Sequence, residues 1–238
     1  IKGTKNMTYI ARNASADPDA PTPGGPAGRP AKTGGCASAG TVGRAYIIAE
    51  GGVNHNGSLD LARQLVQAAA ACGADAIKFQ TFLADRIAAA NAPKAEYQLT
   101  TTDAGESQLA MLSRLELDEA DHWALMACCA EQDVAFLSSP FDIGSIELLA
   151  KLGMVTWKIP SGELTNLPYL QRIGALSGEV ILSTGMADLG EVEAALAVLA
   201  EAGIPPSHTT LLHCCSQYPT PVADVNLRAM QTLAAAFP

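Results

Sequence analysis

The feature of this sequence that most constrains its fold is a regular alternation of short apolar runs and amphipathic stretches from about residue 45 onward. Six apolar runs have the length of buried strands: residues 45–50, 75–80, 134–138, 155–160, 179–183 and 209–213. Stretches with helical periodicity follow at residues 58–72, 117–132, 143–152, 167–176, 189–202 and about 227–237. Strands that are apolar on both faces, each followed by a helix, are typical of a parallel sheet covered by helices. The sequence therefore predicts an α/β fold with about six βα units.

Two parallel architectures fit this spacing. Each unit takes about as much chain as a repeat of a TIM (β/α)8 barrel, which needs eight units and about 250 residues. The first interpretation is therefore an incomplete TIM-type barrel. A six-stranded open α/β sheet is the alternative, and the spacing alone does not exclude it. In both architectures the carboxyl ends of the strands converge, so we expect one ligand cleft there.

Composition bounds the remaining questions. Residues 1–43 are rich in Ala, Pro and Gly and lack periodicity, so we expect a disordered tail before the barrel segment 44–238. A net charge of −9 argues against binding to nucleic acid or an anionic membrane surface. No apolar run reaches the ~18 residues of a membrane span. The six cysteines lack C-x-x-C and zinc-finger spacing, which favours reduced, structural cysteines in a cytoplasmic protein.

Two lysines lie inside apolar strands. Lys78 is in D-A-I-K-F-Q-T and Lys158 is in V-T-W-K-I-P-S-G-E. Burying an ammonium group costs several kcal/mol unless an anion or hydrogen bonds compensate it. One explanation is a structural ion pair, for which Glu163 or Asp142 are candidate partners of Lys158. The other is an anionic ligand, and two such lysines at strand ends favour it.

Other polar side chains collect at the same strand ends. Hydroxyl groups beside lysines suit a phosphate or carboxylate, although any single serine is as readily a helix N-cap or turn residue. The serines are Ser139, Ser161, Ser183 and Ser216. Glu50 and Glu163 are candidate acid/base groups, and Glu50 has the alternative role of capping the barrel mouth.

The histidines have weaker signals. We expect His55 to shape a loop and a helix start, and His122 and His208 to lie at the surface. His213 closes an apolar strand, where a satisfied core histidine and a ligand-binding one are both reasonable interpretations.

Seven strings, in this order, resemble the sialic acid (N-acetylneuraminate) synthase family, which includes the legionaminate and pseudaminate synthases. They are I-I-A-E-G-G-V-N-H-N-G, A-I-K-F-Q-T-F, A-P-K-A-E-Y-Q, S-S-P-F-D, K-I-P-S-G-E-L-T-N-L-P-Y-L, I-L-S-T-G-M and L-L-H-C-C-S-Q-Y-P-T-P. The resemblance covers about residues 45–238. Its most specific part is K-I-P-S-G-E together with I-L-S-T-G-M.

The resemblance implies a TIM barrel, a small C-terminal antifreeze-like domain and a homodimer. It also implies condensation of phosphoenolpyruvate with an N-acylated amino sugar of the N-acetylmannosamine type, which gives a sialic acid and phosphate. A divalent metal, Mn²⁺ or Mg²⁺, would polarise the sugar aldehyde. The alternatives are an N,N'-diacetyllegionaminate or pseudaminate synthase, or a catalytically incomplete barrel fragment that binds an anion.

The resemblance also assigns roles to individual residues. Phosphoenolpyruvate would be held by Lys78, Ser139, Lys158, Ser161, Ser183 and Ser216. Glu50 and Tyr218 would contact the amino sugar, with Glu50 as a candidate acid/base group, and Glu163 would lie near the metal and its water. We expect the family's two metal-binding histidines, the last two βα units and the C-terminal domain beyond residue 238. By that expectation the chain is inactive alone.

Overall fold

The computed structural model describes residues 7–10, 45–90, 92 and 106–238. The chain divides into two compact units. Unit 1 contains Ala49–Met154, and unit 2 contains Val155–Pro238 together with the described residues between Met7 and Ile48.

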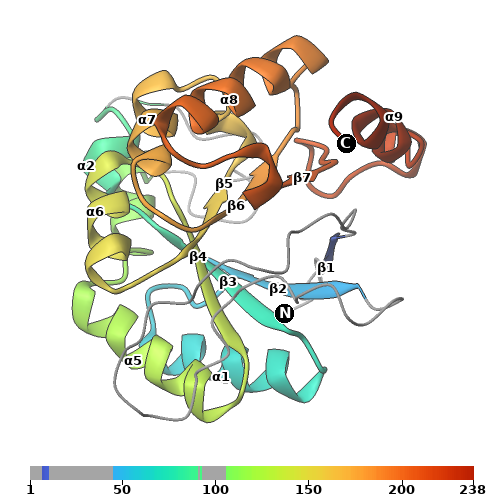
Figure 1. Cartoon of the computed structure of the whole chain (residues 1–238). Helices are drawn as coiled ribbons and strands as arrows, with labels where there is room; N and C mark the ends of the chain where they lie inside the picture. The colour runs from blue at the N-terminus through green and yellow to red at the C-terminus, as the bar shows by residue number, and fades with distance from the viewer. Residues whose placement is uncertain (1–6, 11–44, 91, 93–105) are drawn as a thin grey trace, which may run out of the picture. The chain divides into compact units, whose positions relative to one another are not determined.

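Parallel strands form the centre of unit 1 (Figure 1). A four-stranded sheet has the order β1-β2-β3-β4, with β1 at Met7–Ile10, β2 at Tyr46–Gly52, β3 at Ala76–Thr81 and β4 at Ala135–Pro140. Strands β3 and β4 are parallel, with Ala76 opposite Ala135 and Thr81 opposite Pro140. The helices are α1 (Leu59–Ala71), α2 (Ala84–Ile87), α4 (Gln108–Ser113), α5 (Glu119–Glu131) and α6 (Ile143–Lys151).

One apolar cluster holds α1 and α5 against the strands of unit 1. Val66 of α1, Leu125 of α5 and Phe79 of β3 are each completely buried in it. The helices begin where the sequence supplies a cap. Ser58 accepts a hydrogen bond from the Leu61 N–H, and Asp118 forms a capping box with Asp121.

Unit 2 is a second parallel sheet with helices (Figure 1). Its strands are β5 (Thr156–Ile159), β6 (Glu179–Ser183) and β7 (Thr209–Leu212), in the order β5-β6-β7. Both pairings are parallel. The helices are α7 (Leu167–Gly174), α8 (Leu189–Ala202) and α9 (Ala229–Ala236). Short 3-10 turns occur at η1 (Ser161–Glu163), η2 (Pro206–His208) and η3 (Val222–Asp224).

The structure confirms the α/β class and the parallel strands. All six predicted strands and all six predicted helices are present, with ends that differ by a few residues. The structure differs from the sequence prediction at Met7–Ile10, which form strand β1 inside the segment for which we expect disorder. Thr, Tyr and Ile are frequent in strands, but a run of four residues is too short for its periodicity to identify a strand. The other residues of 1–43 lie outside the described part of the chain. No helix in the described part combines the length and apolarity that crossing a membrane requires.

The contact between α7 and α8 depends on a glycine. A Cβ atom at Gly174 would collide with the Ala202 Cβ and lie 3.2 Å from the Leu199 carbonyl oxygen. We therefore expect Gly174→Ala to lower the free energy of unfolding by about 1–3 kcal/mol, since the two helices would have to separate. Urea unfolding of unit 2 measures this loss.

Gly162→Ala is the matched control, because no atom lies within 4 Å of its added Cβ. We expect it to change stability by no more than about 0.5 kcal/mol. Equal effects of the two substitutions would contradict the proposed role of Gly174 in packing.

Candidate functional site

Lys78 of β3 is paired with Glu50 of β2. The Lys78 Nζ lies 2.7 Å from Glu50 Oε2 and 2.9 Å from Glu50 Oε1. The Lys78 side chain is 10% exposed and that of Glu50 is 23% exposed. Of the two explanations for this buried lysine, the structure therefore contains the structural ion pair. A lysine ammonium has three donors, so a pair that is open on one side is compatible with a further anion.

Gln80 and Ser139 share the face of Lys78. Side chains alternate along a strand, so Lys78 and Gln80 project from the same face of β3. Ser139 of β4 is the register partner of Gln80 and is 2% exposed. A Cβ atom at Gly52 would lie 3.2 Å from Glu50 Oε1 and 3.9 Å from Gln80 Nε2. Glu50 and Gln80 therefore border the same small space beside Gly52.

The corresponding cluster in unit 2 centres on Ser183. Lys158, which is 6% exposed, donates to Ser183 Oγ at 2.7 Å and to the Ile159 carbonyl oxygen at 3.0 Å. The Cys214 thiol donates to the same Ser183 Oγ at 3.3 Å. A hydroxyl group accepts through two lone pairs and donates one hydrogen. Because both acceptor positions of Ser183 are used, its O–H is left to donate to another acceptor, such as an anionic oxygen.

Ser161 belongs to the loop beside this cluster. Its Oγ accepts a hydrogen bond of 2.9 Å from the Gly185 N–H, which joins the loops that follow β5 and β6. Glu163, at the end of η1, accepts a hydrogen bond of 2.7 Å from Asn166. Asp142, the other candidate partner of Lys158, caps helix α6 through the Ser145 N–H at 2.9 Å.

Ser216 and Tyr218 lie in the exposed segment after β7, and Tyr218 is 69% exposed. No contact that the structure describes joins Ser216 to Lys158 or Ser183. The predicted role of these two residues in ligand binding therefore stays a prediction.

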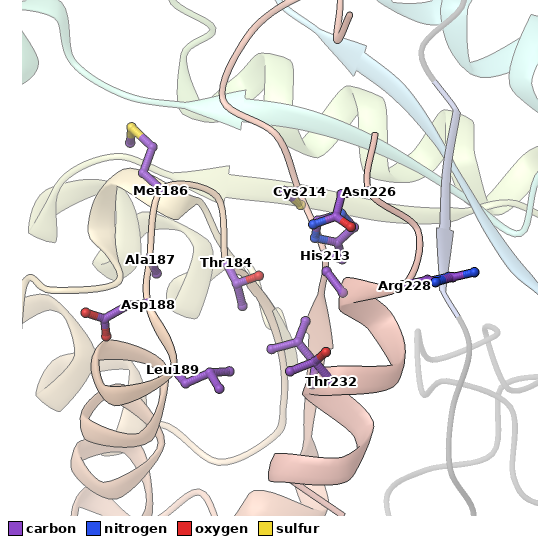
Figure 2. A pocket seen from close by; sticks show the side chains of 12 residues that line it. Thr184, Met186, Ala187, Asp188, Leu189, His213, Cys214, Asn226, Arg228 and Thr232 are labelled. Atoms are coloured by element: carbon purple, nitrogen blue, oxygen red, sulfur yellow. The ribbon is translucent and has the colours of Figure 1, made fainter. Parts of the chain in front are cut away.

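A cavity of about 550 Å³ opens next to Cys214 in unit 2 (Figure 2). Its lining mixes polar and apolar side chains: Thr184, Met186, Ala187, Asp188, Leu189, His213, Cys214, Asn226, Arg228, Ala229, Thr232 and Leu233. His213 is half-buried at its wall, and its Nε2 lies 2.9 Å from the Val225 carbonyl oxygen. A carbonyl only accepts, so His213 donates from Nε2. The lining suits a small polar molecule with an apolar part.

Two histidines of unit 1 are buried. The prediction that His122 lies at the surface is wrong, because only 1% of it is exposed. His122 shares a face of α5 with the buried Leu125 and Cys129, at spacings of three and seven residues, and this periodicity was the overlooked signal. His55 is fully buried and its Nδ1 accepts from the Gly57 N–H at 3.0 Å, which agrees with the expected loop-shaping role. Burial lowers the pKa of both histidines from the ordinary 6.5.

The described residues contain five free cysteines and no group that could bind a metal ion. Cys72, Cys128, Cys129, Cys214 and Cys215 are free, and burial raises the pKa of the Cys129 thiol to about 12. Within the described ranges, no three His, Cys, Asp or Glu side chains are grouped so that they could hold a metal ion. The described residues alone therefore do not form a metal site.

The Lys78–Glu50 pair gives a test with a matched control. Glu50→Gln removes the charge that compensates a buried ammonium, so we expect a loss of about 1–3 kcal/mol in the free energy of unfolding. Glu119→Gln breaks the pair between Lys151 and Glu119, whose side chains are 65% and 43% exposed. We expect little change from it, because solvent screens exposed pairs. If chemical denaturation gave equal losses, the burial argument for Lys78 would fail.

Acid sensitivity tests the buried histidines. Their pKa values are lower in the folded protein than the ordinary 6.5, so the unfolded chain binds protons first as the pH falls. We expect stability to be full above pH 6.5 and to decline below it, by at most about 1.4 kcal/mol per pH unit for each histidine. His122→Gln should make the slope between about pH 6.5 and 5.5 shallower. A slope that is unchanged in this variant would show that His122 does not contribute.

Comparisons with known proteins agree with the resemblance. The model of the NeuB family matches residues 65–238. The N,N'-diacetyllegionaminic acid synthase of Campylobacter jejuni is 53% identical over 194 residues, which cover 82% of this chain and 58% of that protein. The enzyme of the same name from Legionella pneumophila is 47% identical, over 81% of this chain and 54% of that protein. The chain thus spans somewhat more than half the length of these relatives.

Solved structures support the same relationship. The crystal structure of N-acetylneuraminic acid synthetase from Leptospira borgpetersenii, in complex with citrate, superposes with a TM-score of 0.66 at 30% identity and covers 80% of this chain and 62% of that one. The spore coat polysaccharide biosynthesis protein SpsE of Bacillus subtilis has a TM-score of 0.65 at 35% identity, over 80% of this chain and 49% of that one. By its motifs, its family match and these relatives, the chain belongs to the NeuB family of sialic-acid-type synthases.

Proposed function

We propose that this chain takes part in condensing phosphoenolpyruvate with an N-acylated amino sugar to give a sialic-acid-type sugar and phosphate. The observation that carries the proposal is the Ser183 cluster. Lys158 and Cys214 occupy both acceptor positions of the Ser183 hydroxyl, which directs its hydrogen toward a further acceptor. A phosphate or carboxylate oxygen beside the Lys158 ammonium matches this arrangement in charge and in hydrogen bonding.

The substrate supplies two anionic groups, a phosphate and a carboxylate. The proposed phosphoenolpyruvate ligands are the residues expected from the resemblance: Lys78, Ser139, Lys158, Ser161, Ser183 and Ser216. In the reaction, the methylene carbon of phosphoenolpyruvate forms a bond to the aldehyde carbon of the sugar. Water adds to the resulting cation and loses a proton, and the tetrahedral intermediate then expels phosphate.

Glu50 is the proposed acid/base group for the aldehyde oxygen, and Tyr218 and Glu163 are proposed to lie near the sugar and the water. Glu50 is suited to proton transfer because the adjacent Lys78 ammonium holds its carboxylate in place at 2.7 Å. Most of the rate enhancement would come from positioning and electrostatic stabilisation.

The identity of the sugar has a second candidate. N-acetylmannosamine is the substrate type expected from the motifs. The relatives at 53% and 47% identity are named as N,N'-diacetyllegionaminic acid synthases, whereas the N-acetylneuraminate-9-phosphate synthase of Homo sapiens is 29% identical. This difference favours a sugar with two acetamido groups.

The finer expectations from the resemblance remain part of the proposal. They are an incomplete (β/α)8-type barrel, a homodimer, a cytoplasmic location and dependence on Mn²⁺ or Mg²⁺. The relatives of known structure support the barrel, since they match most of the chain at 30% and 35% identity. Titration of phosphoenolpyruvate with and without Mn²⁺ tests the metal dependence.

Calorimetric titration of phosphoenolpyruvate tests the anion site. Lys158→Met keeps the aliphatic stem but removes the charge, and we expect it to weaken binding about 10- to 100-fold. Lys151→Met is the control, because this lysine is 65% exposed and pairs with Glu119 at the surface. Its affinity should stay within about twofold of the unaltered chain.

Three outcomes decide between the candidate functions. Absence of phosphoenolpyruvate binding by the unaltered chain would contradict the proposal. Binding without phosphate release from any N-acylated amino sugar would favour the anion-binding alternative, and release with a diacetamido sugar would establish the legionaminate-type reaction.

A further inference from the structure

Three side chains of unit 1 form a buried chain of hydrogen bonds that the proposed reaction does not use. Ser138 Oγ lies 2.7 Å from Thr81 Oγ1, and Thr81 Oγ1 lies 2.8 Å from His122 Nε2. His122 Nδ1 lies 2.7 Å from the Asp118 carbonyl oxygen. Ser138, Thr81 and His122 are 0%, 3% and 1% exposed. We call these three residues the hydroxyl–histidine chain.

Chemistry fixes the direction of every bond in this chain. The Asp118 carbonyl only accepts, so His122 carries a hydrogen on Nδ1. In the neutral ring Nε2 then lacks a hydrogen and accepts from the Thr81 hydroxyl. Thr81 has spent its only hydrogen, so Ser138 must donate to it. The chain therefore runs one way, from Ser138 through Thr81 and His122 to the Asp118 carbonyl.

The neutral form of His122 is supported by its surroundings. Burial lowers the pKa of its imidazole, while Asp118 and Asp121 on its own helix act in the opposite direction. His55, from the loop after β2, lies near enough to interact electrostatically and is itself shifted toward its neutral form. On the strand side the ring meets Phe136 edge-on, with the ring centres 6.3 Å apart.

The position of the hydroxyl–histidine chain links it to the candidate site. Thr81 is the last residue of β3, directly after Gln80, and Ser138 directly precedes Ser139 in β4. Because side chains alternate along a strand, Thr81 and Ser138 face helix α5, and Gln80 and Ser139 face the opposite side. Gln80 and Ser139 are register partners. The hydroxyl–histidine chain thus connects the ends of β3 and β4 to α5, on the face of the sheet opposite to Gln80 and Ser139.

We propose that neutral His122, with its hydrogen on Nδ1, is a positioning residue that acts through Thr81 and Ser138 to orient Gln80 and Ser139 for ligand binding. This inference rests on the proposed function, because it takes Ser139 as a phosphoenolpyruvate ligand. Without the hydroxyl–histidine chain, the sheet would still form through its backbone hydrogen bonds, but the side chains of Gln80 and Ser139 would lose their fixed orientation.

The first test removes one hydroxyl at nearly constant shape. Thr81→Val leaves both Nε2 of His122 and the hydroxyl of Ser138 without their partner. We expect the dissociation constant for phosphoenolpyruvate to rise about 5- to 10-fold in the folded protein. Thr81→Ser restores the hydroxyl, and its dissociation constant should lie within about twofold of that of the unaltered chain. His122→Gln, which offers an amide oxygen near the place of Nε2, should also retain most of the affinity.

Thr210→Val is the matched control, because Thr210 is a buried threonine, 7% exposed, on β7 of unit 2. Its substitution makes the same chemical change outside the hydroxyl–histidine chain. Unchanged affinity in Thr81→Val, or an equal loss in Thr210→Val, would overturn the positioning role.

A spectroscopic readout separates this inference from the proposed function. Long-range ¹H–¹⁵N spectra of the ligand-free chain should show His122 with a protonated Nδ1 and an unprotonated Nε2. The amide signals of Gln80 and Ser139 should shift in Thr81→Val and return in Thr81→Ser. The opposite tautomer, or unshifted amide signals, would overturn the inference even if phosphoenolpyruvate binds. If the unaltered chain fails to bind it, the proposed function falls, and with it the role in ligand binding.

Discussion

The burial of two lysine ammonium groups in parallel strands is the constraint on which the candidate site depends. Taken as whole residues, Lys78 and Lys158 are 8% and 6% exposed, so each ammonium group must be compensated locally. Lys78 is compensated by the Glu50 carboxylate, which couples β2 to β3. Lys158 donates to Ser183 of β6 and to a carbonyl oxygen of its own strand. Each lysine therefore cross-links neighbouring strands where the polar residues collect.

The parallel sheets explain why polar residues collect there. Strand bodies such as those of β3 and β5 are buried almost throughout, which leaves their ends and the loops after them for polar groups. Helices α1 and α5 pack against the strands of unit 1, as the cluster of Val66, Leu125 and Phe79 illustrates.

Much of this arrangement followed from the sequence, because periodicity and strand-end position are local signals. The six strands and six helices were predictable for that reason. The partners of the buried side chains were not predictable in this way. Glu50 pairs with Lys78 across 28 positions of sequence, a separation that local patterns do not reach. The burial of His122 was predictable, since its spacing of three residues to Leu125 places it on the buried face of α5.

Hydrogen-bond direction decides which serines can serve a ligand, a question that residue type leaves open. Ser183 accepts from Lys158 and Cys214, so its own hydrogen is left for a further acceptor. Ser138 faces Thr81, whose hydrogen is committed to His122, so its own hydrogen must go inward. Ser183 in β6 and Ser138 in β4 thus have opposite roles. The difference arises from whether their neighbours donate or accept, and a single proton on His122 sets it for Ser138.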